Sequence, residues 1–172
     1  MQQFSFYQTL EGNLDKTVCL LTEKCYNNNL KVVIVARDIE MQERINAALW
    51  TYSQKQFIPH GSKSDPLHAE QPVYITTEVE NPNNATVALL VNPTNVINII
   101  PDQQLASSRG QSEISAAYLV FHRIIIIYDS SDKNADNEIN QLNNELQDKK
   151  AVIEHYIQDT KGAWVSKNKS LL

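Results

Sequence analysis

The chain has 172 residues, of which 42% are hydrophobic and 20% are charged, and its net charge is −5 at pH 7. These values fit one globular domain that can bury a core, and the acidic balance argues against a dedicated nucleic-acid binder, which usually carries a basic face. No stretch approaches the roughly 20 apolar residues of a membrane helix, and the first residues lack the basic flank and apolar run of a signal peptide, so we expect a cytoplasmic protein without membrane association.

The chain opens with a short aromatic segment, residues 4–7, which suits a first strand. A helix is expected from residue 13, because four apolar residues then follow at helical spacing: Leu14, Val18, Leu21 and Cys25. Asparagines at 27–29 end it, since Asn tolerates left-handed backbone. Neither Cys19 nor Cys25 has a Cys or His partner at metal-ligand spacing, so both are expected to be buried, reduced thiols.

The next segments continue the alternation of strand and helix. Residues 31–36 form an unbroken β-branched run, which is typical of a strand covered on both faces and indicates a parallel sheet. A second helix is predicted over 40–50, followed by a long polar loop over 52–72. Strands are then expected at 73–76 and 85–91.

The carboxyl-terminal half gives less clear secondary-structure signals. Residues 93–111 hold two prolines and a glycine and suggest an inserted loop, and residues 113–122 suit either a helix or a strand. Residues 123–128 predict a buried strand, because four isoleucines follow one another. A long last helix is expected over 136–158, and the chain is expected to fray over 165–172.

The order of these elements predicts one α/β domain over residues 1–164, built as an open, mostly parallel sheet flanked by helices. Nucleotide chemistry is disfavoured, because binding a phosphate on backbone amides needs clustered glycines. The four glycines of this chain are isolated, and residues 8–13 after the first strand match neither dinucleotide-binding nor P-loop spacing. We therefore expect no cofactor.

Two carboxylates follow the isoleucine strand, and such positions can hold catalytic or metal-binding groups. For Asp129 and Asp132, a turn that caps the next helix is the favoured interpretation. His60 and His68 share one loop, but no nucleophile and carboxylate are visibly arranged around either. A small hydrolase or metal-dependent enzyme using Asp129, Asp132 or His60 remains the alternative to a non-catalytic protein.

The stretch "LWTYSQKQFIPHG", residues 49–61, places Trp50 and Phe57 beside a helix end and a proline. Aromatic residues under a loop are more often core, yet beside a stiff loop they can form an apolar anchor for another protein. Direct binding of single-stranded DNA by these rings is a third possibility. It is less favoured, because such sites combine stacking with a basic groove.

This stretch resembles the Leu-Trp…Phe-x-Pro-His segment of the chi subunit of bacterial DNA polymerase III. Further similarity runs in order through Phe6 and Tyr7, residues 30–35, residues 71–75 and residues 89–92, and covers most of the chain. The resemblance implies a Rossmann-like fold without nucleotide chemistry and an accessory subunit without a catalytic site. It also implies pairing with the psi subunit of the clamp-loader complex, and thereby an indirect association with DNA.

The resemblance further implies binding of the acidic carboxyl-terminal tail of single-stranded DNA-binding protein. A tail that ends in an apolar residue with a free carboxylate requires an apolar slot rimmed by Lys or Arg. The residues that match or adjoin the slot are Trp50, Phe57, Pro59 and His60 on the aromatic segment, with Lys149 and Lys150 as the nearby cations.

One departure from the family concerns the last helix, where the alignment places Asn140, Asn144 and Gln147 at positions that typically hold Lys, Arg and Tyr. Neutral amides pair with a carboxylate less strongly than cations do. The sequence thus leaves open whether tail binding is weaker here or located elsewhere.

Overall fold

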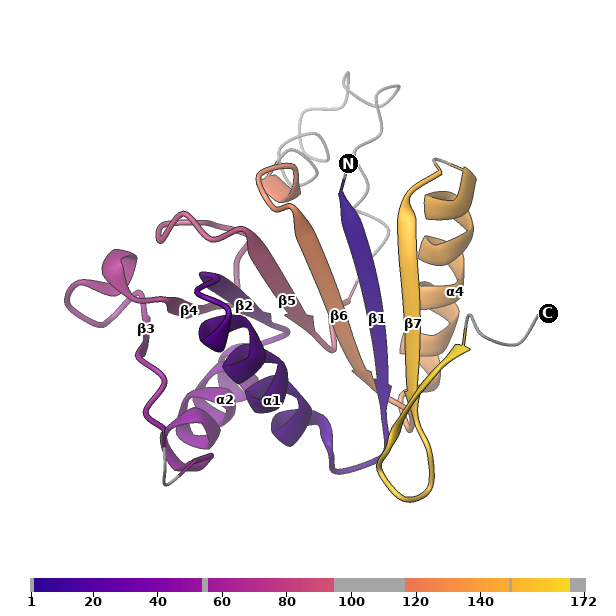
Figure 1. The fold of residues 1–172 in the computed structure, drawn as a ribbon, viewed down its shortest axis with the longest axis horizontal. Coiled ribbons are helices and arrows are strands. Elements are labelled where there is room, and N and C mark those ends of the chain that lie inside the picture. Colours follow the sequence, from indigo (N-terminus) through magenta and orange to yellow (C-terminus); the bar gives the residue numbers. More distant parts are fainter. Residues whose placement is uncertain (1, 54–55, 95–116, 149, 168–172) are drawn as a thin grey trace.

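A computed structural model describes residues 2–53, 56–94, 117–148 and 150–167 (Figure 1). Its strands are β1 Gln3–Thr9, β2 Val32–Ala36, β3 His60–Ser62, β4 Val73–Thr76, β5 Val87–Val91, β6 Arg123–Asp129, β7 Val152–Gln158 and β8 Trp164–Ser166. Its α-helices are α1 Leu14–Asn27, α2 Ile39–Thr51 and α4 Lys133–Asp148, with a short 3₁₀ turn, η1, at His68–Glu70.

The described strands form one eight-stranded sheet in the order β3-β4-β2-β5-β6-β1-β7-β8. Neighbouring strands are parallel, except that β8 returns antiparallel along β7. The first strand of the chain therefore lies inside the sheet, between β6 and β7. This arrangement confirms the predicted open, mostly parallel α/β sheet.

The helices cover both faces of the sheet, with α1 and α2 on one face and α4 on the other (Figure 1). Strand β6 shows why an unbroken apolar run is required. Ile124 and Ile126 belong to the core cluster that includes the buried residues of α4, whereas Ile125 and Ile127 belong to the cluster formed with α1 and α2. Because successive side chains of a strand point to opposite faces, a strand covered on both faces must be apolar at every position.

The predicted last helix over 136–158 was wrong in its second half, because α4 ends at Asp148 and β7 follows. The helix ends where Lys150 adopts a left-handed backbone (φ 54°), with Ala151 N–H donating to Leu146 O at 3.1 Å and Lys150 N–H to Gln147 O at 2.9 Å. This is the hydrogen-bond pattern of a Schellman helix stop. The apolar spacing appeared to continue past the stop because the alternation in β7 falls by chance in phase with the helical stripe.

The predicted fraying over 165–172 does not hold for residues 165 and 166, which belong to strand β8 and pair with β7. Asp159 creates the turn between the two strands, since its Oδ1 accepts hydrogen bonds from the backbone N–H groups of Lys161 and Ala163. The predicted loop over 52–72 likewise contains strand β3 and the 3₁₀ turn η1.

Other expectations fall partly outside the described residues. Of the suggested insertion at 93–111, only residues 93 and 94 are described. Of the ambiguous segment 113–122, residues 117–122 are described, and among these residues 117 and 118 are helical and are followed by a turn. Cys19 and Cys25 are buried free thiols, as predicted, and burial raises the pKa of Cys19 to about 12. Among the described helices, none has the length and apolarity to span a bilayer.

Candidate protein-docking site

Three rings gather at the edge of the sheet where β3 begins, and we call Trp50, Phe57 and His60 the aromatic surface. The Trp50 ring centroid lies 5.2 Å from that of Phe57 and 5.0 Å from that of His60, and Phe57 and His60 are 6.4 Å apart. His60 is buried, whereas 59% of Trp50 and 57% of Phe57 are exposed to solvent. Two large, solvent-exposed aromatic side chains therefore pack against a buried imidazole ring.

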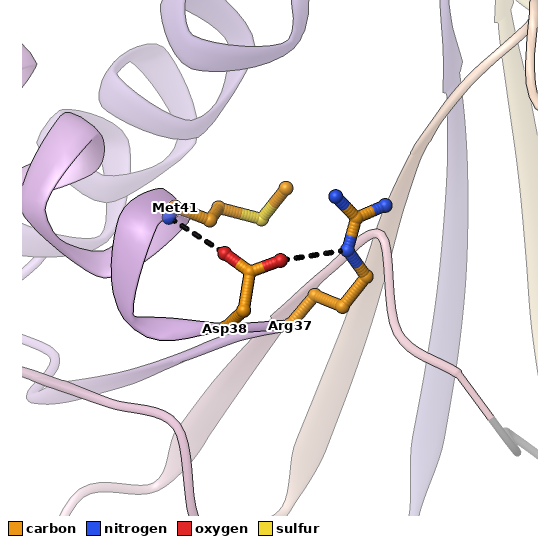
Figure 2. Close-up of polar contacts among 3 residues, drawn as sticks. All are labelled: Arg37, Asp38 and Met41. Carbon is orange, nitrogen blue, oxygen red and sulfur yellow. Dashed lines mark hydrogen bonds and ion pairs between the residues drawn. The ribbon is translucent and has the colours of Figure 1, made fainter.

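Helix α2 brings Trp50 to this edge. The helix begins at Asp38, whose Oδ1 accepts the Met41 backbone N–H at 2.8 Å and whose Oδ2 accepts Arg37 Nε–H at 3.0 Å (Figure 2). The Met41 N–H, followed by the Arg37 side chain, holds the pKa of the Asp38 carboxyl below its usual value. This N-cap starts the helix at the carboxyl end of β2. Since α2 runs back antiparallel to the strand, Trp50 in its last turn reaches the amino-terminal edge of the sheet.

The segment after α2 is tied down at several points. Ile58 lies between Phe57 and Pro59 and is only 1% exposed, so it anchors the segment in the core. Tyr52 donates its hydroxyl hydrogen to Glu23 Oε2 at 3.3 Å, and the Gln56 side-chain amide donates to Asn27 Oδ1 on α1. Sequence reasoning missed the role of Ile58, because an aliphatic residue in an irregular segment shows no periodicity that would mark it as buried.

His60 is the fixed part of the aromatic surface. Its Nδ1 lies 2.7 Å from Ile58 O, which accounts for one ring nitrogen. Its Nε2 is buried and has no hydrogen-bond partner among the described residues. A buried polar atom is normally paired, so this nitrogen is an exception within the described part of the chain.

Lys150, one of the two cations assigned to this site by sequence, does not join it. Lys150 lies two residues before β7, which is six positions from β3 in the sheet order, a separation of about 29 Å at roughly 4.8 Å per strand. Lys149 lies outside the described residues. Asn140, Asn144 and Gln147 are exposed on α4, which covers the other face of the sheet from α2. The structure thus brings Trp50, Phe57 and His60 together, with Pro59 in the same segment, and leaves Lys150 remote.

The residues of the enzymatic alternative are also separated. Asp129 Oδ1 accepts hydrogen bonds from Ser131 N–H at 2.8 Å and Ser131 O–H at 2.7 Å, and Asp132 Oδ1 accepts from the backbone of Asn134 and Ala135 at the start of α4. These are the turn and capping roles that the sequence favoured. His60 begins β3, whereas Asp129 ends β6, so they lie at opposite edges of the parallel sheet.

A cavity of about 480 Å³ lies at the carboxyl-terminal edge of the sheet, and Asp129 and Asp132 line it together with Arg37 and Arg44. Both guanidinium groups are paired within the chain: Arg37 with Asp38 at 3.0 Å, and Arg44 with Asp15 at 2.9 Å. No group of three or more His, Cys, Asp or Glu residues within the described ranges is arranged to hold a metal ion.

Comparison with known proteins identifies the family. Residues 1–141 match the family model described as "DNA polymerase III chi subunit, HolC". A protein of Rickettsia prowazekii (strain Madrid E), named "Probable DNA polymerase III subunit chi", is 47% identical over 129 residues, which cover 75% of this chain and 71% of that protein. The family-model match spans the aromatic segment and strands β1 to β6.

Proposed function

The chain belongs to the DNA polymerase III chi subunit family and is thus an accessory replication subunit, and we propose that it links single-stranded DNA-binding protein to the clamp-loader complex through the psi subunit. In this role it is non-catalytic, acts in the cytoplasm and associates with DNA only through its partners. The net charge of −5 supports the indirect association, because a protein that binds DNA directly usually presents a basic face.

The observation that carries this proposal is the exposure of Trp50 and Phe57 on a fixed base. Large aromatic side chains that are held in place and exposed are the residues that dominate binding energy at protein interfaces. The buried Ile58 fixes the backbone of this segment, and the buried His60 ring is fixed by its hydrogen bond to Ile58 O. Little conformational freedom is therefore lost when a partner covers the aromatic surface.

The psi subunit is the partner that this geometry favours for the aromatic surface. The ring contacts join only Trp50, Phe57 and His60, and the assigned cation Lys150 belongs to the β7 side of the sheet. An acidic tail with a free carboxylate requires a cation beside its apolar slot, whereas a protein partner with an apolar pocket does not. The tail of single-stranded DNA-binding protein, suggested by sequence for this surface, is the second candidate.

The proposal is tested by measuring the affinity of the psi subunit for Trp50→Ala and Phe57→Ala variants by isothermal titration. We expect each substitution to weaken psi binding by about 1–3 kcal/mol, the scale of an interface anchor. Ile39→Ala is the matched control, because Ile39 is 57% exposed on the opposite end of the same helix; it should leave the affinity unchanged.

Three outcomes separate the candidates. Loss of psi binding in both aromatic variants, with the control intact, supports the assignment. Loss of binding to an acidic tail peptide instead, with psi binding unchanged, would move the tail to this surface. Unchanged affinity for both partners would show that the aromatic surface is not a docking site.

A further inference from the structure

A cavity of about 510 Å³ lies between α1 and the turn that joins β7 to β8, and we call it the hairpin pocket. In Figure 1 this turn and the connection from β1 to α1 lie at the same end of the sheet. The volume falls within the range of about 300–1,000 Å³ that is typical of small-molecule sites. The side chains that line the cavity decide which class of ligand can fill it.

One amide side chain holds the two halves of the pocket together. Gln158 Oε1 accepts hydrogen bonds from the backbone N–H of Leu10 at 3.0 Å and from the Asn13 side chain at 3.2 Å. Its Nε2 donates to Gly162 O at 3.3 Å. Gln158 therefore ties the entrance of α1 to the hairpin turn, and the shape of the pocket exists before any ligand arrives.

The apolar part of the lining suits a planar ring. Trp164 lines the pocket from the hairpin, and Leu20, which is 39% exposed, lines it from α1. The indole is fixed, because it packs edge-on against Tyr7 with ring centroids 5.1 Å apart, and Tyr7 in turn stacks on Tyr156 at 4.7 Å. Flat heteroaromatic rings such as nucleobases bind by stacking on aromatic and aliphatic side chains of this kind.

The charged part of the lining is entirely positive within the described residues. Lys16 of α1 and Lys161 of the turn line the pocket, and no Asp or Glu among the described residues does. The cavity at the carboxyl-terminal edge of the sheet is different, since three aspartates line it. In a chain with a net charge of −5, the hairpin pocket is therefore a local site for an anion.

The two lysines are also free to bind a ligand. Among the described residues, neither the Lys16 nor the Lys161 ammonium has a salt-bridge or hydrogen-bond partner. The nearby carboxylates are engaged elsewhere: Asp15 pairs with Arg44, and Asp159 Oδ1 accepts two backbone N–H groups of the turn. An anion would thus gain two charge-assisted contacts without displacing an internal ion pair.

We propose that the hairpin pocket binds a nucleoside monophosphate, with its base between Leu20 and Trp164 and its phosphate between Lys16 and Lys161. Two ammonium groups match the charge of about −1.5 to −2 that a phosphate monoester carries at pH 7. A bare phosphate would leave the indole uncovered, and an uncharged nucleoside would leave both lysines without a partner. The isolated glycines of the chain exclude a phosphate cradle of backbone amides, but they do not exclude a phosphate held by side chains.

A free nucleotide fits this pocket better than a nucleotide within a strand. Binding a single strand requires several rings and a basic groove along the backbone, whereas the described lining offers one ring and two cations in a chain with a net charge of −5. The inference goes beyond the proposed function and does not depend on it, because neither psi nor single-stranded DNA-binding protein takes part.

The test uses Trp164 fluorescence in the full-length protein. The chain has two tryptophans, so Trp50→Phe leaves Trp164 as the only indole. Titration with deoxyadenosine 5′-monophosphate should quench this indole saturably. Deoxyadenosine, which lacks the phosphate, should bind at least about tenfold more weakly. Inorganic phosphate, which lacks the base, should also bind at least about tenfold more weakly when isothermal titration is used.

Substitutions then locate the site. Lys16→Gln and Lys161→Gln should each weaken nucleotide binding about fivefold or more, because each removes one charge-assisted contact with the phosphate. Lys24→Gln is the matched control, since Lys24 is an exposed lysine farther along α1 that does not line the pocket. Trp164→Leu keeps an apolar side chain without the ring, and isothermal titration should show a loss of about tenfold. Thermal melts establish that each variant is folded.

The proposal is overturned if deoxyadenosine or inorganic phosphate binds as tightly as the nucleotide, or if the Lys16 and Lys161 variants behave like the Lys24 control. A short single-stranded oligodeoxyadenylate that binds more than about tenfold tighter than the mononucleotide would also overturn it, because the ligand would then be a strand. Psi affinity should be the same in all three lysine variants. A failure of psi binding in the unsubstituted chain would count against the proposed function alone.

Discussion

The aromatic surface and the hairpin pocket, a cavity of about 510 Å³ between α1 and the β7–β8 turn, lie at opposite ends of one sheet and use tryptophan in opposite ways. Trp50 is 59% exposed and packs against the buried His60, so it presents a projecting apolar ring to solvent. Trp164 packs edge-on against Tyr7 and lines a hollow flanked by two lysines, so it can receive a planar ring. The residue type alone does not determine the partner, whereas the shape and charge around it do. The two surfaces are remote from each other, so binding at one leaves the other accessible, which is compatible with the proposed linking role.

The largest effect is expected from replacing His60, the buried ring of the aromatic surface. His60→Ala deletes a buried ring that contacts both Trp50 and Phe57, and we expect the free energy of unfolding to fall by about 2 kcal/mol, with psi binding weakened as well. Urea denaturation measures the first and titration the second. His122→Ala, at an exposed histidine, should change stability by less than about 0.5 kcal/mol. Equal effects of the two substitutions would show that the ring contacts do not support the surface.

The next largest effect is expected from salt concentration, which should change the two binding affinities by different amounts. Raising the salt concentration from about 0.05 M to about 0.5 M screens exposed charges, so binding of a peptide with the acidic tail of single-stranded DNA-binding protein should weaken about tenfold. Psi binding at the aromatic surface should change by less than about twofold, because burial of apolar area does not depend on screening. Isothermal titration at the two salt concentrations measures both. Equal salt dependence would remove the contrast between a charged and an apolar docking site.

A smaller effect is expected at the hairpin turn. Gly162 has φ of +81°, and a Cβ added there would meet no atom within 4 Å, so Gly162→Ala carries only the backbone cost of left-handed geometry. We expect a loss of about 1 kcal/mol in the free energy of unfolding, with psi binding unaffected. Gly162→Asn should lose less, because Asn tolerates this backbone region. Thermal melts of the two variants make the comparison, and an Ala variant as stable as the parent would show that the turn changes its conformation.

The smallest effect concerns pH on the β7 side. Burial, with a contribution from Lys167, lowers the pKa of His155, which stacks on Phe6 at 4.6 Å. The unfolded chain therefore binds this proton more readily than the folded chain. Stability from His155 is fully present above its ordinary pKa of about 6.5 and is lost as pH falls toward the lowered folded value. Denaturation at about pH 7.5 and about pH 5 should show a smaller decrease for His155→Gln than for the parent. An equal decrease would assign the acid sensitivity to other groups.

Much of the fold could be predicted because its signals are local. The four isoleucines of β6 indicate a strand with two covered faces, and the aromatic segment is contiguous from Trp50 to His60. Strand β7 was missed because Ile153 and Ile157 continue the apolar stripe of α4 by chance. The helix stop at Lys150 also uses a lysine in a left-handed conformation, where sequence rules expect Gly or Asn.

The hairpin pocket could not be predicted for a different reason. It joins Leu10 and Lys16 to Lys161 and Trp164, which meet only because β1 pairs in parallel with β7. Neither half shows a motif by itself, and a lysine without a partner looks like any solvated lysine in a sequence. The separation of Lys150 from the aromatic segment was hidden similarly, since strand order is a property of the whole sheet.

The position of β1 has a consequence for how the protein is made. Both neighbours of this strand, β6 and β7, are synthesised late, and the Gln3–Arg123 contact spans 120 positions of the chain. Such distant pairings form slowly, because a large loop must close first. On the ribosome, β1 is without its strand partners until β6 and β7 have been translated. Its apolar Phe4 and Phe6 are then exposed to chaperones during that interval.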